Sequence, residues 1–269
     1  MKKYFSNPKI ITGIVLTGLA FLLMLLGMVY LPYDPDAADI PHKLQRMSMQ
    51  HLLGTDNLGR DILSRIMTGY RISFLIGLTS AAAGLAVGCI IGAAGGYLGG
   101  AVDVAVVKLI DIQMAFPGIL LALMLIAVAG PGLHTTITAL CIMSVPRFAR
   151  ITRSGCIKYR DSFLVLSARS RGASSLRIIM RHILPNIAQD LCVTFSLSFA
   201  YAVMNESGLS YLGLGVQPPE PSFGRMLSDA QNYILTSPWF IIVPAVALAV
   251  PVSGLMLIGD GMTGLKDKD

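Results

Sequence analysis

The sequence has the composition of an integral membrane protein. Of its 269 residues, 54% are hydrophobic and only 13% are charged, whereas a soluble domain has roughly 25% charged residues. The formal net charge of +6 is concentrated in a few segments, which favours membrane orientation over nucleic-acid binding. The four cysteines are widely spaced without a C-x-x-C pair, and they predict reduced thiols instead of disulfides or a metal site.

The sequence contains six apolar stretches, and a bilayer span needs about 20 mostly apolar residues. The first, Ile10–Leu31, has 22 residues without a charge, and it exceeds the roughly 7–15-residue apolar core of a signal peptide. Because no clear A-x-A cleavage site follows it, we expect a retained membrane helix. The other stretches cover residues 72–102, 112–130, 133–148, 187–214 and 238–259.

Three of these stretches are interrupted. Pro146 lies near the end of the fourth, Asp190 and Glu206 fall in the fifth, and the sixth contains Pro244 and Pro251. Six helices still fit the pattern best. We therefore predict an all-α, polytopic integral membrane protein with six transmembrane helices.

The distribution of Lys and Arg predicts the orientation in the membrane, because short basic loops stay in the cytoplasm. With the N-terminus inside, the cytoplasmic segments hold 15 basic residues and the external segments hold 6. We therefore expect both termini to be cytoplasmic. The cytoplasmic set comprises Lys2, Lys3, Lys9, Lys108, nine residues of the segment 147–185, Lys266 and Lys268.

The segment 147–185 is the most basic part of the chain, with nine Lys or Arg against the single acid Asp161. Its pattern predicts two short helices separated by Gly172, which suits a position with positive φ. Asp161 or Ser162 is placed to cap the first helix, and Ser174 is placed to cap the second. The apolar residues of the two predicted helices are Phe163, Leu164, Leu166, Leu176, Ile179 and Ile183. Such a helix–glycine–helix segment is typical of a docking surface.

Glycines recur every fourth residue in the second stretch, at positions 84, 88, 92, 96 and 100. This spacing places them on one face of a helix, where another helix approaches closely because side chains are missing. The pattern predicts a tight packing seam. Both static packing and sliding during transport are consistent with it.

Several stretches, in chain order, carry a resemblance to a known family. They are LPYDP (31–35), HLLGTDNLGRDILSR (51–65), GYRISF (69–74), GYLGGAVD (96–103), IDIQMAFP (110–117), GASSLRIIMRHILPN (172–186), ESGLSYLGLGVQPPEPSFGRML (206–227) and IGDGM (258–262). These motifs cover nearly the whole chain. The chain resembles the membrane-spanning permease subunits of bacterial ABC importers, in the peptide and nickel branch.

The resemblance implies a division of the chain and a set of partners. Residues 1–71 would form a membrane helix and an external segment with an amphipathic helix, and residues 72–265 a transmembrane core. The core would carry a cytoplasmic coupling loop at 147–185. The implied partners are a second homologous permease subunit (a heterodimer), two cytoplasmic ATPase subunits that bind ATP-Mg, and an extracytoplasmic solute-binding protein. The implied location is the bacterial inner membrane.

The family's coupling motif reads EAA, three residues, Gly, and a spacer ending in Leu-Pro. Its first position falls on Leu166, so the family's acidic residue is replaced here. The residues that the resemblance assigns to ATPase coupling are Ser167, Ala168, Arg169, Gly172, Ala173, Arg177, Leu184 and Pro185.

The sequence does not predict an enzyme. It lacks the G-x-x-x-x-G-K-[ST] phosphate loop, so we expect ATP hydrolysis on separate subunits and no cofactor on this chain. It also lacks a G-x-S-x-G nucleophile motif. The histidines at positions 42, 51, 134 and 182 are too scattered for the spacing of metal ligands.

Two features allow more than one interpretation. Glu206, at the edge of the fifth stretch, is either a pathway or gating group near the external face or a helix-end acid in interfacial water. The external segment 34–71 has five acids and five bases. It either receives a solute-binding protein or caps the transmembrane bundle. The later segment 217–237 is a candidate external gate.

We predict alternating-access import of peptides or of nickel and its chelates. The short segment before the first span slightly favours the nickel type. An ion-gradient-driven secondary transporter would need ionisable residues in the middle of several helices, and the sequence offers Glu206 alone. A structural membrane protein is the remaining alternative.

Overall fold

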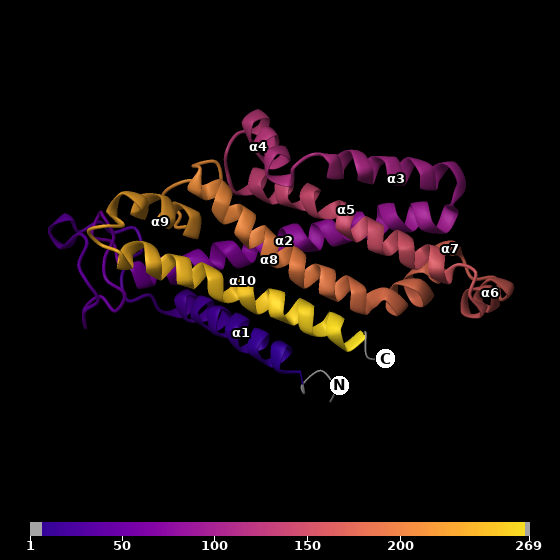
Figure 1. Cartoon of the computed structure of the whole chain (residues 1–269), viewed down its shortest axis with the longest axis horizontal. Coiled ribbons are helices and arrows are strands. Elements are labelled where there is room, and N and C mark those ends of the chain that lie inside the picture. The colour runs from indigo at the N-terminus through magenta and orange to yellow at the C-terminus, as the bar shows by residue number, and fades with distance from the viewer. Residues whose placement is uncertain (1–6, 267–269) are drawn as a thin grey trace.

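A computed structural model describes residues 7–266, which are built from helices and turns with one isolated bridge and no β-strand (Figure 1). The predicted all-α class is confirmed for this range. Lys2, Lys3 and Lys268, which entered the charge count, lie outside the described residues.

Five long helices lie side by side along the longest axis of the molecule (Figure 1). They are α1 (Pro8–Val29), α2 (Ile62–Ala93), α5 (Leu133–Tyr159), α8 (Ala188–Tyr211) and α10 (Trp239–Lys266). The shorter helices are α3 (Gly100–Ala115), α4 (Gly118–Ala129), α6 (Phe163–Ser170), α7 (Ser175–Ile178) and α9 (Phe223–Ala230). Short 3-10 turns occupy Ile40–His42, Leu184–Ile187 and Gln231–Tyr233, and π-helical turns occupy Ala94–Leu98 and Ile179–Ile183.

The two ends of the bundle carry different elements. Helices α6 and α7 lie at one end, and α9 lies with the segment 30–61 at the other (Figure 1). We call these the α6 end and the α9 end. The start of α1 and the end of α10 both lie toward the α6 end (Figure 1).

Four helical stretches are long and apolar enough to cross a membrane, and the number is five if the bent pair α3–α4 counts as one span. They are Pro8–Val29, Ile62–Leu98, Ser175–Tyr211 and Trp239–Gly264, with Gly100–Ala115 and Gly118–Ala129 as the bent pair. Helix α5 has 27 residues, about 40 Å at 1.5 Å per residue, but it is more polar than the others. The chain is therefore an all-helical, polytopic membrane protein with more spans than any single anchor requires.

Helix α2 begins at Ile62, ten residues before the predicted start of the second span. Asp61 caps this start, since its carboxylate accepts hydrogen bonds from the backbone N and the Oγ of Ser64, both at 2.8 Å. The residues before Asp61 form turns in place of the predicted amphipathic helix. The predicted division after residue 71 therefore falls inside α2.

The third and fourth predicted spans also differ from the structure. The third is bent by 87° between α3 and α4, and the bend contains Phe116 in an extended conformation followed by Pro117. A residue that precedes proline is disfavoured in the helical region, which accounts for the break. The fourth was predicted to end near residue 148, but α5 continues to Tyr159.

The prolines inside α5 and α10 are tolerated because neighbouring helices supply hydrogen bonds. Pro146 has no N–H for the carbonyl of Ile142, and the side-chain amide of Gln113 on α3 donates to that oxygen. Pro251 likewise frees the carbonyl of Ala247, and the hydroxyl of Tyr70 on α2 donates to it at 2.7 Å. A freed carbonyl in an apolar environment costs several kcal/mol unless such a partner is present.

The predicted glycine seam joins α2 to α5. A Cβ atom at Gly84 would lie 1.7 Å from Ser144 Oγ, and one at Gly88 would lie 2.5 Å from Phe148 Cβ. Gly92 and Gly96 face the backbone of α5 equally closely, at 2.2 Å and 2.5 Å. Gly100 does not belong to the seam, because it starts α3 and faces open space. The close approach of α2 and α5 therefore depends on glycine at four positions.

Candidate functional site

The predicted helix–glycine–helix segment is present at the α6 end. Ser162 caps α6, and Ser174 accepts a hydrogen bond from the backbone N of Arg177 at the start of α7. Between them Gly172 has φ +77°, and two reversed hydrogen bonds close the end of α6. They run from Gly172 N to Arg169 O at 2.9 Å and from Ala173 N to Ala168 O at 3.1 Å. This is a Schellman ending, which requires positive φ at Gly172.

One face of this hairpin is buried against the helical bundle. Val165 and Ala168 of α6 pack with Ile178 and Ile183 of the following segment. The same cluster includes Ala93 at the end of α2 and Cys156 near the end of α5. The hairpin is therefore seated directly on the two helices that the glycine seam joins.

The opposite face of the hairpin is open and both apolar and basic. Phe163 is 93% exposed and Leu176 is 70% exposed. Arg171, Arg177 and Arg181 are exposed as well, and within residues 7–266 no carboxylate lies within ion-pair distance of them. An exposed apolar patch rimmed by charge is typical of a protein–protein contact.

The structure brings the predicted coupling residues together in this hairpin. Ser167, Arg169 and Arg177 are exposed, whereas Ala168 is buried. Arg169 also contacts the bundle, because its Nη2 donates to the hydroxyl of Tyr97 at 3.2 Å. The remaining predicted residues occupy the turn and the link to α8: Gly172, Ala173, Leu184 and Pro185.

Glu206 lies inside the protein, with 0% of its side chain exposed. Ser210 Oγ donates to Glu206 Oε1 at 2.7 Å and accepts a hydrogen bond from Val216 N at 3.0 Å. Ser207 Oγ lies 3.4 Å from Glu206 Oε2. The carboxyl group therefore connects the end of α8 to the segment that leads to α9, and in this conformation it does not line an open passage.

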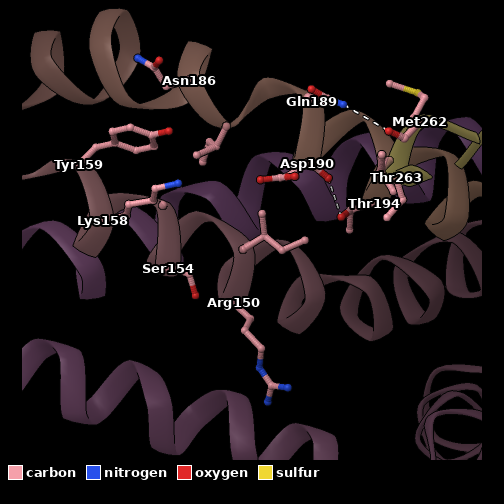
Figure 2. Close-up of a pocket in the computed structure, with 14 residues that line it drawn as sticks. Arg150, Ser154, Lys158, Tyr159, Asn186, Gln189, Asp190, Thr194, Met262 and Thr263 are labelled. Carbon is pink, nitrogen blue, oxygen red and sulfur yellow. Dashed lines mark hydrogen bonds between the residues drawn. The ribbon is translucent and has the colours of Figure 1, made fainter. Parts of the chain in front are cut away.

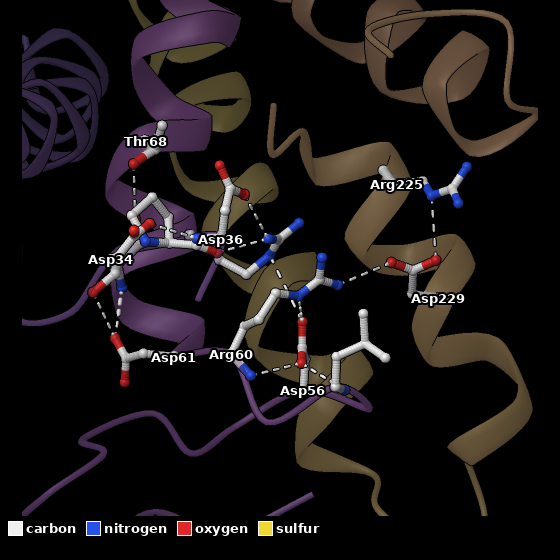
Figure 3. Close-up of polar contacts among 12 residues, drawn as sticks. Asp34, Asp36, Asp56, Arg60, Asp61, Thr68, Arg225 and Asp229 are labelled. Carbon is white, nitrogen blue, oxygen red and sulfur yellow. Dashed lines mark hydrogen bonds and ion pairs between the residues drawn. The ribbon is translucent and has the colours of Figure 1, made fainter. Parts of the chain in front are cut away.

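Charged side chains at the α9 end form an internal network (Figure 3). Asp56 accepts a hydrogen bond from Arg60 Nε at 2.6 Å and lies 3.8 Å from Arg65 Nε. Arg60 also lies 3.6 Å from Asp229 on α9, which pairs with Arg225 at 3.3 Å. The network ties the segment 30–61 to α9, as expected of a segment that caps the bundle.

Four basic residues that the sequence placed in a loop lie on α5 itself. Arg153 forms a two-point pair with Asp103 of α3, at 2.5 Å and 2.7 Å. Arg150 lies 3.6 Å from Asp111 of the same helix. The guanidinium carbon of Arg147 lies 4.5 Å from the ring centroid of Tyr201 on α8. The fourth is Lys158. The spacing of positions 147, 150, 154 and 158 was a helical signal that the loop assignment overlooked.

A cavity of about 700 Å³ lies between α5, α8 and the end of α10 (Figure 2). Lys158 and Asp190 extend into it from α5 and α8 (Figure 2). Gln189 Nε2 bonds the carbonyl of Met262 at 3.3 Å along its edge. This cavity is polar and is open toward the α6 end. Within the described residues, no group of three His, Cys, Asp or Glu side chains is arranged to hold a metal ion.

An all-helical bundle with a bent span, a glycine seam and a docking hairpin at one end defines a polytopic membrane permease. The chain belongs to the family of binding-protein-dependent transport system inner membrane components, whose model matches residues 84–269. It is therefore a multi-pass inner-membrane protein.

Named relatives and solved structures agree with this assignment. The chain is 36% identical over 267 residues to the dipeptide transport system permease protein DppC of Alkalihalophilus pseudofirmus, covering 99% of this chain and 88% of that protein. It is 37% identical over 253 residues to the glutathione transport system permease protein GsiD of Pectobacterium atrosepticum, covering 92% and 84%. The MetNI methionine ABC transporter, solved in inward-facing conformations, has the same fold with a TM-score of 0.60 at 17% identity, covering 73% of this chain and 93% of that one.

Proposed function

We propose that this chain is the permease subunit of an ATP-driven, binding-protein-dependent importer of peptides. It forms one half of the translocation pathway, and a second homologous permease subunit forms the other half. Two cytoplasmic ATPase subunits bind ATP-Mg, and an extracytoplasmic binding protein delivers the solute. Family membership and the hairpin at the α6 end support this arrangement.

The proposed topology has six spans with the α6 end in the cytoplasm. The sixth span is α5, which the glycine seam holds along the apolar helix α2. The α6 end contains most of the basic residues of the segment 147–185, and basic segments stay in the cytoplasm. Since α1 starts and α10 ends toward the same end, both termini are cytoplasmic in this proposal (Figure 1).

The observation that carries the proposal is the two-sided hairpin. Its buried face is fixed to α2 and α5, and its open face presents Phe163, Leu176 and unpaired arginines. A rigid element with one face anchored and the other free transmits the motion of a partner to the helices beneath it. Arg169 adds a direct contact from the hairpin to Tyr97 at the end of α2. The chain itself lacks a phosphate loop, so the partner supplies ATP hydrolysis.

Peptides are the proposed solute class. The relatives named above are described as dipeptide and glutathione permeases, and both molecules are peptides with free carboxylates. These relatives favour peptides over the nickel type that the length before the first span had favoured.

Glu206 has a proposed role in the external gate. Through Ser210 it holds Val216, so it acts as a latch for the segment between α8 and α9. Opening of the α9 end would move this segment. The paired charges of the segment 30–61 serve as a cap, and its exposed residues remain open to the solute-binding protein.

A pair of matched substitutions tests the hairpin. Phe163→Asp changes a side chain that is 93% exposed at the α6 end, and Leu235→Asp changes one that is 96% exposed near the α9 end. Because neither side chain is buried, both variants should fold. We expect Phe163→Asp to weaken co-purification with the ATPase subunits by about tenfold or more, the loss typical of a central contact residue.

The Leu235→Asp variant should retain the ATPase subunits at the level of the unchanged protein. Equal retention by both variants would contradict the docking role of the hairpin. Uptake by the permease on an ion gradient, without ATPase subunits, would instead indicate a secondary transporter.

A further inference from the structure

A charged side chain lies near mid-depth on the face formed by α3, α5 and α8. Arg147 contacts Tyr201, which is 13 residues after Ala188 and 10 residues before Tyr211, the two ends of α8. The next residue, Phe148, packs on Gly88, near the middle of the uncharged stretch of α2. Two helices therefore place Arg147 near the middle of the bundle.

Arg147 has no carboxylate within ion-pair distance among residues 7–266. Its exposed guanidinium is held by the ring of Tyr201 through a cation–π contact alone. The next two arginines of α5 differ, because Arg150 pairs with Asp111 and Arg153 pairs with Asp103. Arg147 is thus available to an anion that comes from elsewhere.

This face cannot lie against lipid. Ionisable side chains within the membrane face a water-filled cavity or a partner, because exposure to hydrocarbon is costly. The opposite behaviour is seen on α1, where the residues from Ile10 to Val29 include no charge and many apolar side chains are exposed. Lipid therefore suits α1, and the face with Arg147 and Arg150 turns toward the solute pathway.

Three cavities follow the same face of α5. Arg147 lines cavities of about 210 Å³ and 320 Å³. Arg150 lines the second of these and also the cavity of about 700 Å³, which contains Lys158. Arg147, Arg150 and Lys158 span 11 residues of α5, about 16 Å along the helix. They form a basic row from mid-depth to the α6 end.

We propose that this basic row binds the C-terminal carboxylate of the peptide as it crosses the membrane, with Arg147 as its first contact. The inference rests on the proposed peptide-import function. A guanidinium presents a planar pair of donors that matches a carboxylate. The Tyr201 ring fixes the Arg147 guanidinium without neutralising it. Arg150 and Lys158 continue the row toward the cytoplasmic release side.

The test uses the complete transporter, with its binding protein and ATPase subunits, in proteoliposomes. Uptake of trialanine is compared with uptake of trialanine amide, which lacks the terminal carboxylate. We expect Arg147→Gln to lower the uptake ratio of free acid to amide by about tenfold, as for the loss of one charge-assisted contact. Arg147→Lys keeps the positive charge and should retain the ratio within about threefold.

The ratio isolates the permease, because the same binding protein serves every variant. Arg71→Gln makes the same chemical change at another exposed arginine, near the start of α2, and should leave the ratio unchanged. An unchanged ratio in Arg147→Gln, or an equal fall for both peptides, would overturn the carboxylate contact while leaving peptide import intact. Failure of the unchanged transporter to import either peptide would remove the peptide function, and the carboxylate contact with it.

Discussion

The two ends of the bundle are both rich in charge, but only one end uses its charges internally. At the α9 end, Asp56 is 2% exposed and pairs with Arg60 and Arg65. At the α6 end, Arg171 and Arg177 are exposed, and no carboxylate in the described chain is within ion-pair distance of them. The first end forms a closed cap, and the second presents an open surface.

The balance of acids and bases in each segment accounts for this difference. The segment 34–71 has five acids and five bases, so its charges are able to pair among themselves and with α9. The segment 147–185 has nine bases and one acid, so pairing within it is impossible for most of them. Charge balance within a segment therefore separates a self-contained cap from a surface that needs a partner.

The largest expected effect comes from breaking the cap. Asp56→Ala leaves Arg60 and Arg65 without their buried partner, and the loss of one member of a buried pair costs about 3–5 kcal/mol. We expect a clear fall in the thermal unfolding midpoint of the purified complex. Asp39→Ala is the matched control, because its pair with His42 is half exposed and contributes less than about 1 kcal/mol. Similar midpoints for the two variants would contradict a structural cap.

An intermediate effect is expected at the hairpin turn. Gly172→Val places a β-branched residue at φ +77°, which costs at least about 1–2 kcal/mol. A Cβ atom at this position meets nothing within 4 Å, so the strain is purely conformational. We expect solute uptake to fall by about tenfold, while the amount of permease in the membrane stays normal.

Gly172→Asn distinguishes strain from any other effect of a side chain at this turn. Asparagine adopts positive φ more readily than valine, so uptake by this variant should lie close to that of the unchanged protein. Normal uptake in Gly172→Val would count against the coupling role of the hairpin.

The smallest expected effect concerns salt. Raising the ionic strength from about 0.1 M to 1 M shortens the Debye length from about 10 Å to 3 Å. Association of the ATPase subunits with the exposed arginines should weaken by a few-fold, because exposed charges are screened. The thermal midpoint set by the buried Asp56 network should change little. Measuring both in the same detergent-purified sample checks the contrast, and equal sensitivity of the two would argue against it.

Local signals made the hairpin predictable from the sequence. Ser162 and Ser174 cap the helices that they precede, and Gly172 provides the positive φ, so each feature depends on residues a few positions apart. The glycine seam was predictable for the same reason, since its period of four lies within one helix. Family membership also followed from short motifs along the chain.

Contacts between distant residues were not predictable. The end of α5 was misplaced because Pro146 looked like a helix terminator, and the donor that rescues it, Gln113, lies 33 residues earlier on another helix. The misplacement put Arg147 and Arg150 in a loop and hid the basic row. Glu206 was expected near water, yet Ser210 and the residues around it enclose it completely.

The hydrogen bonds that receive the proline-freed carbonyls also restrict how this sequence changes over time. Gln113 serves Ile142 only while residue 146 is proline, and Tyr70 serves Ala247 only while residue 251 is proline. Replacement of the proline first releases its donor from this duty, whereas loss of the donor first strands a carbonyl in apolar surroundings. Related permeases are therefore expected to lose these pairs in one order, with the proline replaced before its donor.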